Sequence, residues 1–203
     1  MMARNGNNGI VIGEVCDLED PLDLARIRVT YPHLGGVKSD WAKLVTPMAG
    51  KERGIFFRPE VGDEVLVAFE LNDSERPYVL GALWSQEDPP PPNEGSAKDN
   101  NWRFIRSRSG HVIKLDDKQG QERIEIIDKD EKRRIVIDCG GSKIQITADD
   151  GDIEINAGAG NVKVEAAKNV DITASTEVNI KAKNITLDAS GVLTLKGGTV
   201  NIN

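Results

Sequence analysis

The chain has 203 residues, only 4% of them aromatic, and a formal net charge of −7 at pH 7. This length suits one or two small domains. The acidic balance argues against a nucleic-acid partner, because phosphate binding depends on clustered Lys and Arg. The sequence contains no apolar run that could span a bilayer and no signal-like N-terminus, so we expect a protein made in the cytoplasm without a signal peptide.

Five alternating segments predict a small barrel over residues 9–88, preceded by a flexible N-terminus at residues 1–8. The segments are residues 9–15, 25–31, 41–45, 64–69 and 77–84. Short strands separated by Pro and Gly, without helical periodicity, favour a five-stranded barrel of the oligonucleotide/oligosaccharide-binding (OB) fold. Six aromatic residues are expected to fill its core rather than to stack on bases: Trp41, Phe56, Phe57, Phe69, Tyr78 and Trp84.

A linker at residues 89–101 follows the barrel. Residues 89–92 are four consecutive prolines, which donate no backbone hydrogen bonds and favour a stiff extended chain. After the linker, residues 102–106 and 111–115 predict a strand pair. This pair would form a collar over residues 102–121.

From residue 122 to residue 203 the chain repeats one short phrase ten times. Each phrase contains two aliphatic residues separated by one residue, and in most phrases a small residue stands two positions after the second. Period-two geometry places each pair on one face of a strand. The pairs are Ile124 and Ile126, Ile135 and Ile137, Ile144 and Ile146, Ile153 and Ile155, Val162 and Val164, Val170 and Ile172, Val178 and Ile180, Ile185 and Leu187, Leu193 and Leu195, and Val200 and Ile202.

Successive phrases are not expected to form hairpins, because a near-constant period with a constant inward face is typical of a chain that winds around an axis. One chain could wind alone with three phrases per coil, or three chains could wind together. The lone coil leaves both sheet ends open to pairing, whereas three chains pair every strand with strands of two neighbours. We therefore favour an all-β protein in which the barrel precedes an intertwined triple-stranded β-helix. In this homotrimeric β-prism the aliphatic pairs form the trimer core.

No catalytic, cofactor-binding or metal site is predicted, and the chain is not expected to be an enzyme. Cys139 takes the small inward position of its phrase and is expected to be a buried thiol. The adjacent carboxylates at residues 116–117 and 149–150 are expected to be solvated, because neighbouring side chains on a strand or corner point apart.

The last phrase has no small residue or closing loop after it. Three copies would leave strand edges and an aliphatic layer uncovered at this position. Four residues are therefore expected to bind another protein: Val200, Asn201, Ile202 and Asn203.

Several segments carry a resemblance to a known family. Residues 57–69 read FRPEVGDEVLVAF and residues 76–81 read RPYVLG; shorter matches are WA at 41–42, PMAG at 47–50, SGH at 109–111 and LDD at 115–117. From residue 9 onward the chain resembles the central spikes of contractile injection machines. These are the baseplate assembly protein V of tailed phages and the valine-glycine-repeat spike of type VI secretion.

The resemblance implies a structural homotrimer in the baseplate of a virion tail or injection particle. Its barrels would dock on a separate trimeric hub protein, and its tip would carry a PAAR-type protein. On firing it would be delivered outside the cell and would contact the target cell envelope transiently. Neither the large domain that precedes the barrel in type VI spikes nor the lysozyme-like domain of some phage spikes is expected here. Neither histidine, His33 or His111, lies near the end, so an iron-binding tip is not expected.

Two other functions are weighed against the spike. A trimeric tailspike-like polysaccharide-binding or depolymerising protein would need a carboxylate-lined groove with aromatic residues, and the repeat has no Phe, Tyr or Trp. A barrel that binds an oligonucleotide or a sugar is disfavoured by the acidic charge.

Overall fold

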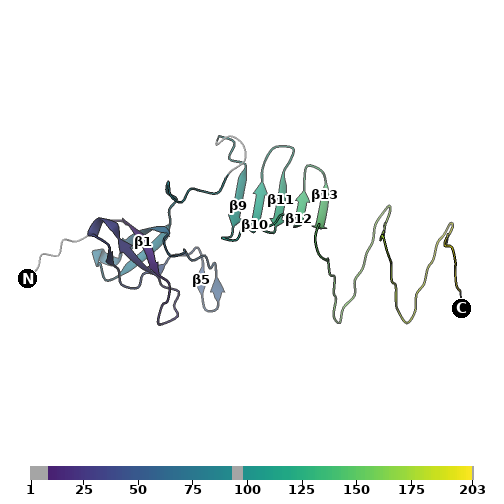
Figure 1. Cartoon of the computed structure of the whole chain (residues 1–203), viewed down its shortest axis with the longest axis horizontal. Helices are drawn as coiled ribbons and strands as arrows, with labels where there is room; N and C mark the ends of the chain where they lie inside the picture. The colour runs from purple at the N-terminus through teal and green to yellow at the C-terminus, as the bar shows by residue number, and fades with distance from the viewer. Residues whose placement is uncertain (1–8, 93–97, 203) are drawn as a thin grey trace, which may run out of the picture. The chain divides into compact units, whose positions relative to one another are not determined.

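The computed structural model describes residues 9–92 and 98–202 and shows an all-β chain in two compact units, which divide after Gly151. The predicted flexible N-terminus and residues 93–97 of the predicted linker lie outside the described residues. Figure 1 shows the order of the elements. The strands of the barrel are β1 (Val11–Asp17), β2 (Arg28–Tyr31), β3 (Val37–Lys38), β4 (Lys43–Leu44), β7 (Glu64–Phe69) and β8 (Pro77–Ala82).

The barrel forms around one curved sheet with the strand order β3-β2-β1-β7-β8-β4. β1 pairs antiparallel with β2 and with β7, and β8 pairs antiparallel with β7 and parallel with β4. The sheet closes where Ile27 and Ala42 exchange backbone hydrogen bonds of 3.0 and 2.8 Å. Two 3-10 turns, Pro32–Leu34 and Glu70–Asn72, complete this part of the chain.

The core of the barrel consists mostly of β-branched side chains, so the prediction of an aromatic core was wrong for most of the six residues, although Phe69 packs against the core. Phe56, Phe57 and Trp84 are 71%, 64% and 72% exposed, and Trp41, Tyr78 and Phe69 are half-buried. A barrel of such short strands has a narrow interior, which Val and Ile fill well on a pleated surface. The buried core residues are Val15, Ile27, Val29, Tyr31, Ala42, Val65, Val67 and Val79.

Tyr31 is the one aromatic residue in that buried core. Its ring centroid lies 6.0 Å from that of Phe69. Burial is the largest cause that raises the pKa of its hydroxyl to about 12, and the hydroxyl has no hydrogen-bond partner among the described residues. Tyr31 therefore stays neutral at physiological pH and acts as a packing residue.

The loop before β2 is held by the carboxylate of Asp20, whose side chain is only 2% exposed. Its oxygens accept hydrogen bonds from the amides of Leu22, Leu24 and Arg26, at 3.1, 3.0 and 3.2 Å. The Arg26 side chain adds two more, at 3.0 and 2.6 Å. The hydrogen bond from Arg26 is the largest of the causes that hold the pKa of Asp20 well below its ordinary value. The loop contains Ala25 in a left-handed conformation with φ of 57°, which these bonds offset.

Asp20 gives the barrel a predictable pH dependence. Because its pKa is lower in the folded chain than in the unfolded one, its stabilisation is complete above the unfolded value of about 3.9 and is lost as the pH falls below it. Asp20→Asn is expected to unfold at a lower temperature than the wild type at pH 7. The difference should shrink at pH 3, as thermal unfolding followed by circular dichroism would show. A pH-independent difference would contradict this role.

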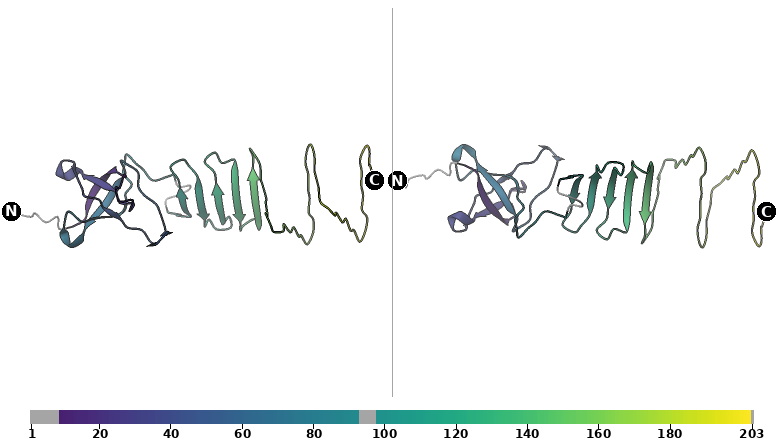
Figure 2. Two further views of the ribbon diagram at one scale, coloured as in Figure 1. Left: turned by 90° about the horizontal axis from the view of Figure 1, so that it is seen from below. Right: turned by 90° about the horizontal axis from the view of Figure 1, so that it is seen from above.

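A five-stranded antiparallel sheet follows the linker, with the strand order β13-β12-β11-β10-β9. Its strands are β9 (Trp102–Arg106), β10 (Val112–Asp116), β11 (Arg123–Ile127), β12 (Arg133–Asp138) and β13 (Lys143–Ala148). The predicted collar strands are therefore present, as β9 and β10. The sheet continues without interruption into the first three phrases of the repeat, as Figure 2 shows.

The expectation that no phrases form hairpins was therefore wrong for these three. β11, β12 and β13 reverse direction at tight turns that contain Glu131 and Ser142 with φ of 57° and 50°. The carboxylate of Asp128 accepts hydrogen bonds from the amides of Lys132 and Arg133, and the Asp138 carboxylate accepts one of 2.7 Å from Gly141. Such carboxylate-closed turns reverse the chain, which the aliphatic period alone does not reveal.

Residues 152–202 form no strand within the chain (Figures 1 and 2). The one backbone hydrogen bond found within these residues joins the amide of Gly160 to the carbonyl of Ala157. The chain thus does not close into the solitary coil that was the alternative to an intertwined one. The backbone donors and acceptors of residues 152–202 are thus almost all unpaired within the chain, which is rare in a folded protein.

Candidate assembly surfaces

One face of the sheet β9–β13 is a continuous aliphatic surface. The strand register aligns nine aliphatic residues in two rows across the strands. They are between 39% and 72% exposed, so the sheet is a single layer whose apolar face has no cover in the chain. The first row contains Ile105, Ile113, Ile126, Ile135 and Ile146, and the second contains Leu115, Ile124, Ile137 and Ile144.

The aliphatic surface begins earlier than the sequence indicated. Six of its nine residues belong to the first three predicted pairs, whereas Ile105, Ile113 and Leu115 come from the collar strands. The signal was present, because residues 111–115 alternate as the repeat does. The turns that join β9, β10 and β11 interrupt the regular spacing of the repeat. The common face of these strands is therefore evident only from the strand register.

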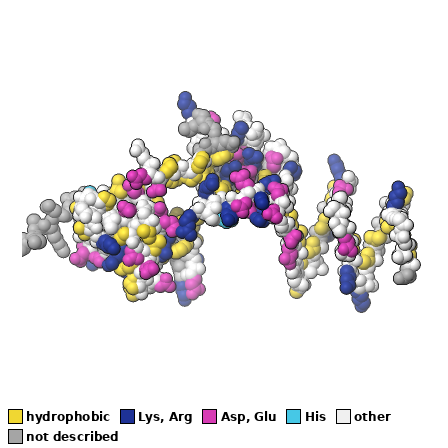
Figure 3. Space-filling view, viewed as in Figure 1, with side chains coloured by type: hydrophobic (Ala, Val, Ile, Leu, Met, Phe, Trp, Pro, Cys, Tyr) yellow, Lys and Arg dark blue, Asp and Glu magenta, His cyan; other side chains and the backbone are white. Residues whose placement is uncertain are grey.

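The other seven predicted pairs lie in residues 152–202, and all of their members are exposed. The exposed fractions run from 50% at Val200 to 84% at Ile202. In Figure 3 hydrophobic side chains lie at the surface of residues 152–202, among charged side chains. Exposed apolar surface on this scale marks an interaction surface. The structure therefore does not bring these pairs together within one chain.

The opposite face of the sheet carries a cluster of charged residues around Trp102. The Nζ atom of Lys114 lies 2.5 Å from Oε2 of Glu125 and 4.2 Å from the centre of the Trp102 ring. The indole Nε1 donates a 2.9 Å hydrogen bond to Asp116. Arg123 lies 3.7 Å from Asp116 and 3.6 Å from Glu125. These residues sit on three neighbouring strands, so the cluster ties β9, β10 and β11 together.

Asp116 is buried, at 3% exposed, so the expectation that it is solvated was wrong. Its neighbour Asp117 is exposed and lies 2.9 Å from Arg103. Asp149 and Asp150 pair with Arg134 and Lys132, at 3.1 and 3.0 Å. The adjacent carboxylates therefore face different partners, as expected for neighbours on a strand, and each is engaged in structural ion pairs.

The remaining candidate groups do not form a chemical site in the described part of the chain. Cys139 is exposed in the single chain, and its predicted burial would need sister chains. Burial is the largest cause that raises the pKa of the Cys16 thiol. His111 accepts a 3.1 Å hydrogen bond from the amide of Lys129 through Nδ1, which is a structural contact. No group of three His, Cys, Asp or Glu residues within the described ranges is placed to hold a metal ion.

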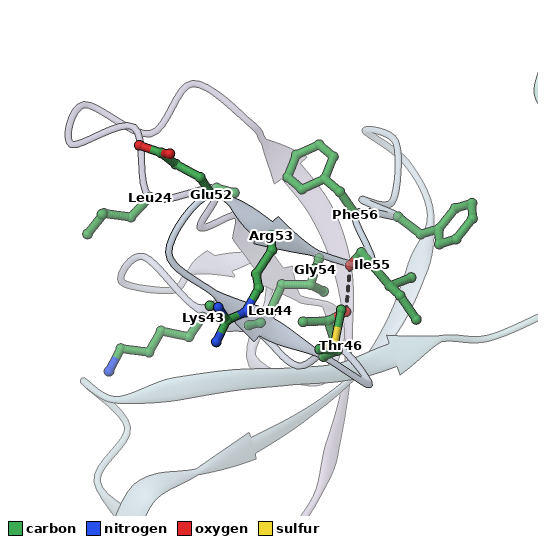
Figure 4. Close-up of a pocket in the computed structure, with 14 residues that line it drawn as sticks. Leu24, Lys43, Leu44, Thr46, Glu52, Arg53, Gly54, Ile55 and Phe56 are labelled. Carbon is green, nitrogen blue, oxygen red and sulfur yellow. Dashed lines mark hydrogen bonds between the residues drawn. The ribbon is translucent and has the colours of Figure 1, made fainter.

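An apolar cavity of about 600 Å³ opens on the barrel beside the hairpin of β5 (Ala49–Gly50) and β6 (Arg53–Gly54). Figure 4 shows Leu24 and Lys43 on one side of the cavity and Phe56 on the other. Thr46 donates a 2.6 Å hydrogen bond to the carbonyl of Ile55, which fixes the base of the hairpin. Neither the hairpin nor the cavity was predicted from the sequence. β5 and β6 are only two residues long, which is too short for an alternating pattern to show.

Of the four predicted tip residues, Asn203 lies outside the described residues. Val200, Asn201 and Ile202 are exposed and belong to no strand. Their role stays a prediction.

Comparison with known proteins matches both halves of the chain. Residues 11–84 match a family described as "Type VI secretion system/phage-baseplate injector OB domain". Residues 124–203 match one described as "Uncharacterized protein conserved in bacteria (DUF2345)". The first match confirms the OB fold of the barrel.

The curated relatives of the chain include two kinds of spike protein. The "Spike protein" of Escherichia phage P2 is 30% identical over 115 residues, which cover 57% of this chain and 49% of that protein. The "Type VI secretion system spike protein VgrG1a" of Pseudomonas aeruginosa is 29% identical over 94 residues, which cover 43% of this chain and 15% of that protein. The alignment thus covers about half of the phage protein and a small part of the type VI protein. Among the described residues no helix has the length and apolar character needed to cross a membrane.

Proposed function

Because the chain belongs to the family of phage-baseplate and type VI secretion spike proteins, we propose that three copies wind together into the central spike of a contractile injection particle. In this assembly the aliphatic pairs from Ile124 to Ile202 face inward as the trimer core. Residues 152–202 of each chain pair with the corresponding residues of two sister chains as a triple-stranded β-helix.

The observation that carries the proposal is the state of residues 152–202 in the single chain. Their aliphatic pairs are at least half exposed and their extended backbone has almost no hydrogen-bond partner. A prism of three chains supplies both missing elements, since it encloses the pairs and places a strand on each side of every strand. The aliphatic face of the sheet β9–β13 requires the same cover.

The function of such an assembly is mechanical. A spike that transmits an axial push must resist bending and splaying, and continuous strand pairing between chains around a dry core provides this resistance. Seven pairs from Ile153 to Ile202, at about 4.8 Å per strand, give this part of the spike a length of roughly 35 Å. Each Val, Ile or Leu that becomes fully buried contributes about 1.5–3 kcal/mol. Residues 152–202 are therefore expected to fold only in the presence of two sister chains.

The barrel is proposed to dock on a separate trimeric hub protein. The apolar cavity beside the β5–β6 hairpin supports this role, because Phe56 and Phe57 at its rim are exposed and fill no core. At the other end, Val200 and Ile202 are proposed to contact a PAAR-type tip protein as the spike pierces the target envelope. No catalytic step is proposed, because the adjacent carboxylates are engaged in ion pairs. A polysaccharide-cleaving tailspike is accordingly not favoured.

The solution mass of the full chain tests the proposal. The trimer predicts three times the chain mass of 22.1 kDa, about 66 kDa, by size exclusion with light scattering. The mass should stay the same on dilution into the nanomolar range, because an intertwined core cannot separate without unfolding. A species with the mass of one chain would contradict the proposal.

A further inference from the structure

The sheet β9–β13 and residues 152–202 differ in how much of their strand pairing a single chain can form. β9 to β13 form a sheet whose register is fully paired within the chain, and compact unit 1 ends just beyond it at Gly151. Residues 152–202 carry the same aliphatic pairs but have no strand. One part of the trimer core is therefore arranged before the chains meet, and the other is not.

The register of the sheet is fixed by its polar face. Lys114 pairs directly across from Glu125, and Asp116 pairs directly across from both Trp102 and Arg123. A slip of β10 by one residue would move Lys114 onto the aliphatic face and away from Glu125 on β11. The side chains of these two residues are only 12% and 11% exposed, so such a slip would also separate a largely buried ion pair. The two aliphatic rows are therefore aligned without help from a second chain.

We propose that the aliphatic face of β9–β13 is the surface on which copies of this chain first meet, and that residues 152–202 wind together afterwards, starting from Asp152. This inference rests on the proposed trimer. The occupant of the face is a second copy, because the same aliphatic pairs continue without a break into residues whose backbone has no partner in the chain. No other segment of the described chain carries this pattern.

The order of events follows from chain entropy. Three free segments of about fifty residues pay a large cost to find one common register, because every contact between them is non-local. Once the three sheets are joined, the segments start from one place, at an effective concentration of about a millimolar. Winding then adds one layer at a time to a surface that already exists.

Two matched substitutions in the full chain distinguish assembly that begins at the β9–β13 face from assembly in which all parts of the repeat join at the same time. Ile126 lies in the first row of the sheet and is 49% exposed, and Val178 lies in residues 152–202 and is 52% exposed. Ile126→Asp is expected to reduce the trimer fraction roughly ten-fold or more at equal chain concentration, because it places charges on the first contact surface. Val178→Asp should keep the trimer mass and raise hydrogen exchange only around residue 178 and beyond it.

Pulse-labelled hydrogen exchange during refolding of the wild type provides a second measurement that needs no variant. The amides of β10 to β12 should become protected before those of residues 153–187. Protection of both regions at the same rate would overturn the proposal, as would loss of the trimer in Val178→Asp to the same extent as in Ile126→Asp. If the wild type has the mass of one chain, the proposed function fails instead, and the two failures are thus distinct.

Discussion

Replacing Ile27 by alanine is expected to lower the free energy of unfolding of the barrel by about 2–5 kcal/mol. The side chain of Ile27 is completely buried, and its backbone exchanges the two hydrogen bonds with Ala42 that close the sheet. Truncation removes three methyl or methylene groups from a core that consists mostly of Val side chains. The lost transfer free energy and the cost of the cavity therefore add.

Hydrogen exchange of the β1, β2 and β7 amides in the full chain measures this effect, because it reports the opening of the barrel separately from that of the rest of the molecule. Ile12→Ala is the matched control, since Ile12 lies on β1 but is 48% exposed. It should change the same free energy by less than about 1 kcal/mol. Equal losses in the two variants would show that Ile27 is not a core residue of the folded barrel.

The barrel illustrates what the sequence could and could not predict. Its strands are evident because apolar and polar residues alternate over several residues, as in Glu64–Phe69, and the structure places a strand there with the same bounds. The composition of the core was mispredicted because hydrophobicity does not reveal the width of a barrel. Phe56 and Phe57 are as apolar as any core residue, but they follow the β5–β6 hairpin and line the cavity instead.

The repeat shows a second limit of sequence reasoning. The aliphatic pairs predict an inward face, and the register of β11 to β13 confirms a common face for the first three. Whether neighbouring phrases turn back or continue around an axis depends on a few turn residues, here Asp128 and Asp138 with the left-handed Glu131 and Ser142. Such residues occur both where a chain turns back and where it continues around an axis. The spacing of the aliphatic pairs alone therefore does not distinguish the two structures.

The buried ion pair on the sheet was also outside the reach of the sequence. Lys114 and Glu125 are eleven positions apart in the sequence, and the strand register places them opposite each other. This face of the sheet is covered by its own long side chains, with Lys114 lying over the ring of Trp102. Cross-strand neighbours are fixed only once the turn between β10 and β11 is known.

Lys114→Met is expected to destabilise the sheet by about 3 kcal/mol, because it leaves the Glu125 carboxylate in a buried position without its closest partner. Arg123 remains 3.6 Å from that carboxylate, which keeps the loss at the lower end of the range for a broken buried pair. The double variant Lys114→Met with Glu125→Leu should recover most of the loss, since no charge is then left uncompensated. Exchange of the β10 and β11 amides in the full chain measures all three proteins. A double variant as unstable as Lys114→Met would mean that the packing of the lysine stem over Trp102, rather than the charge of Glu125, determines the stability of this face.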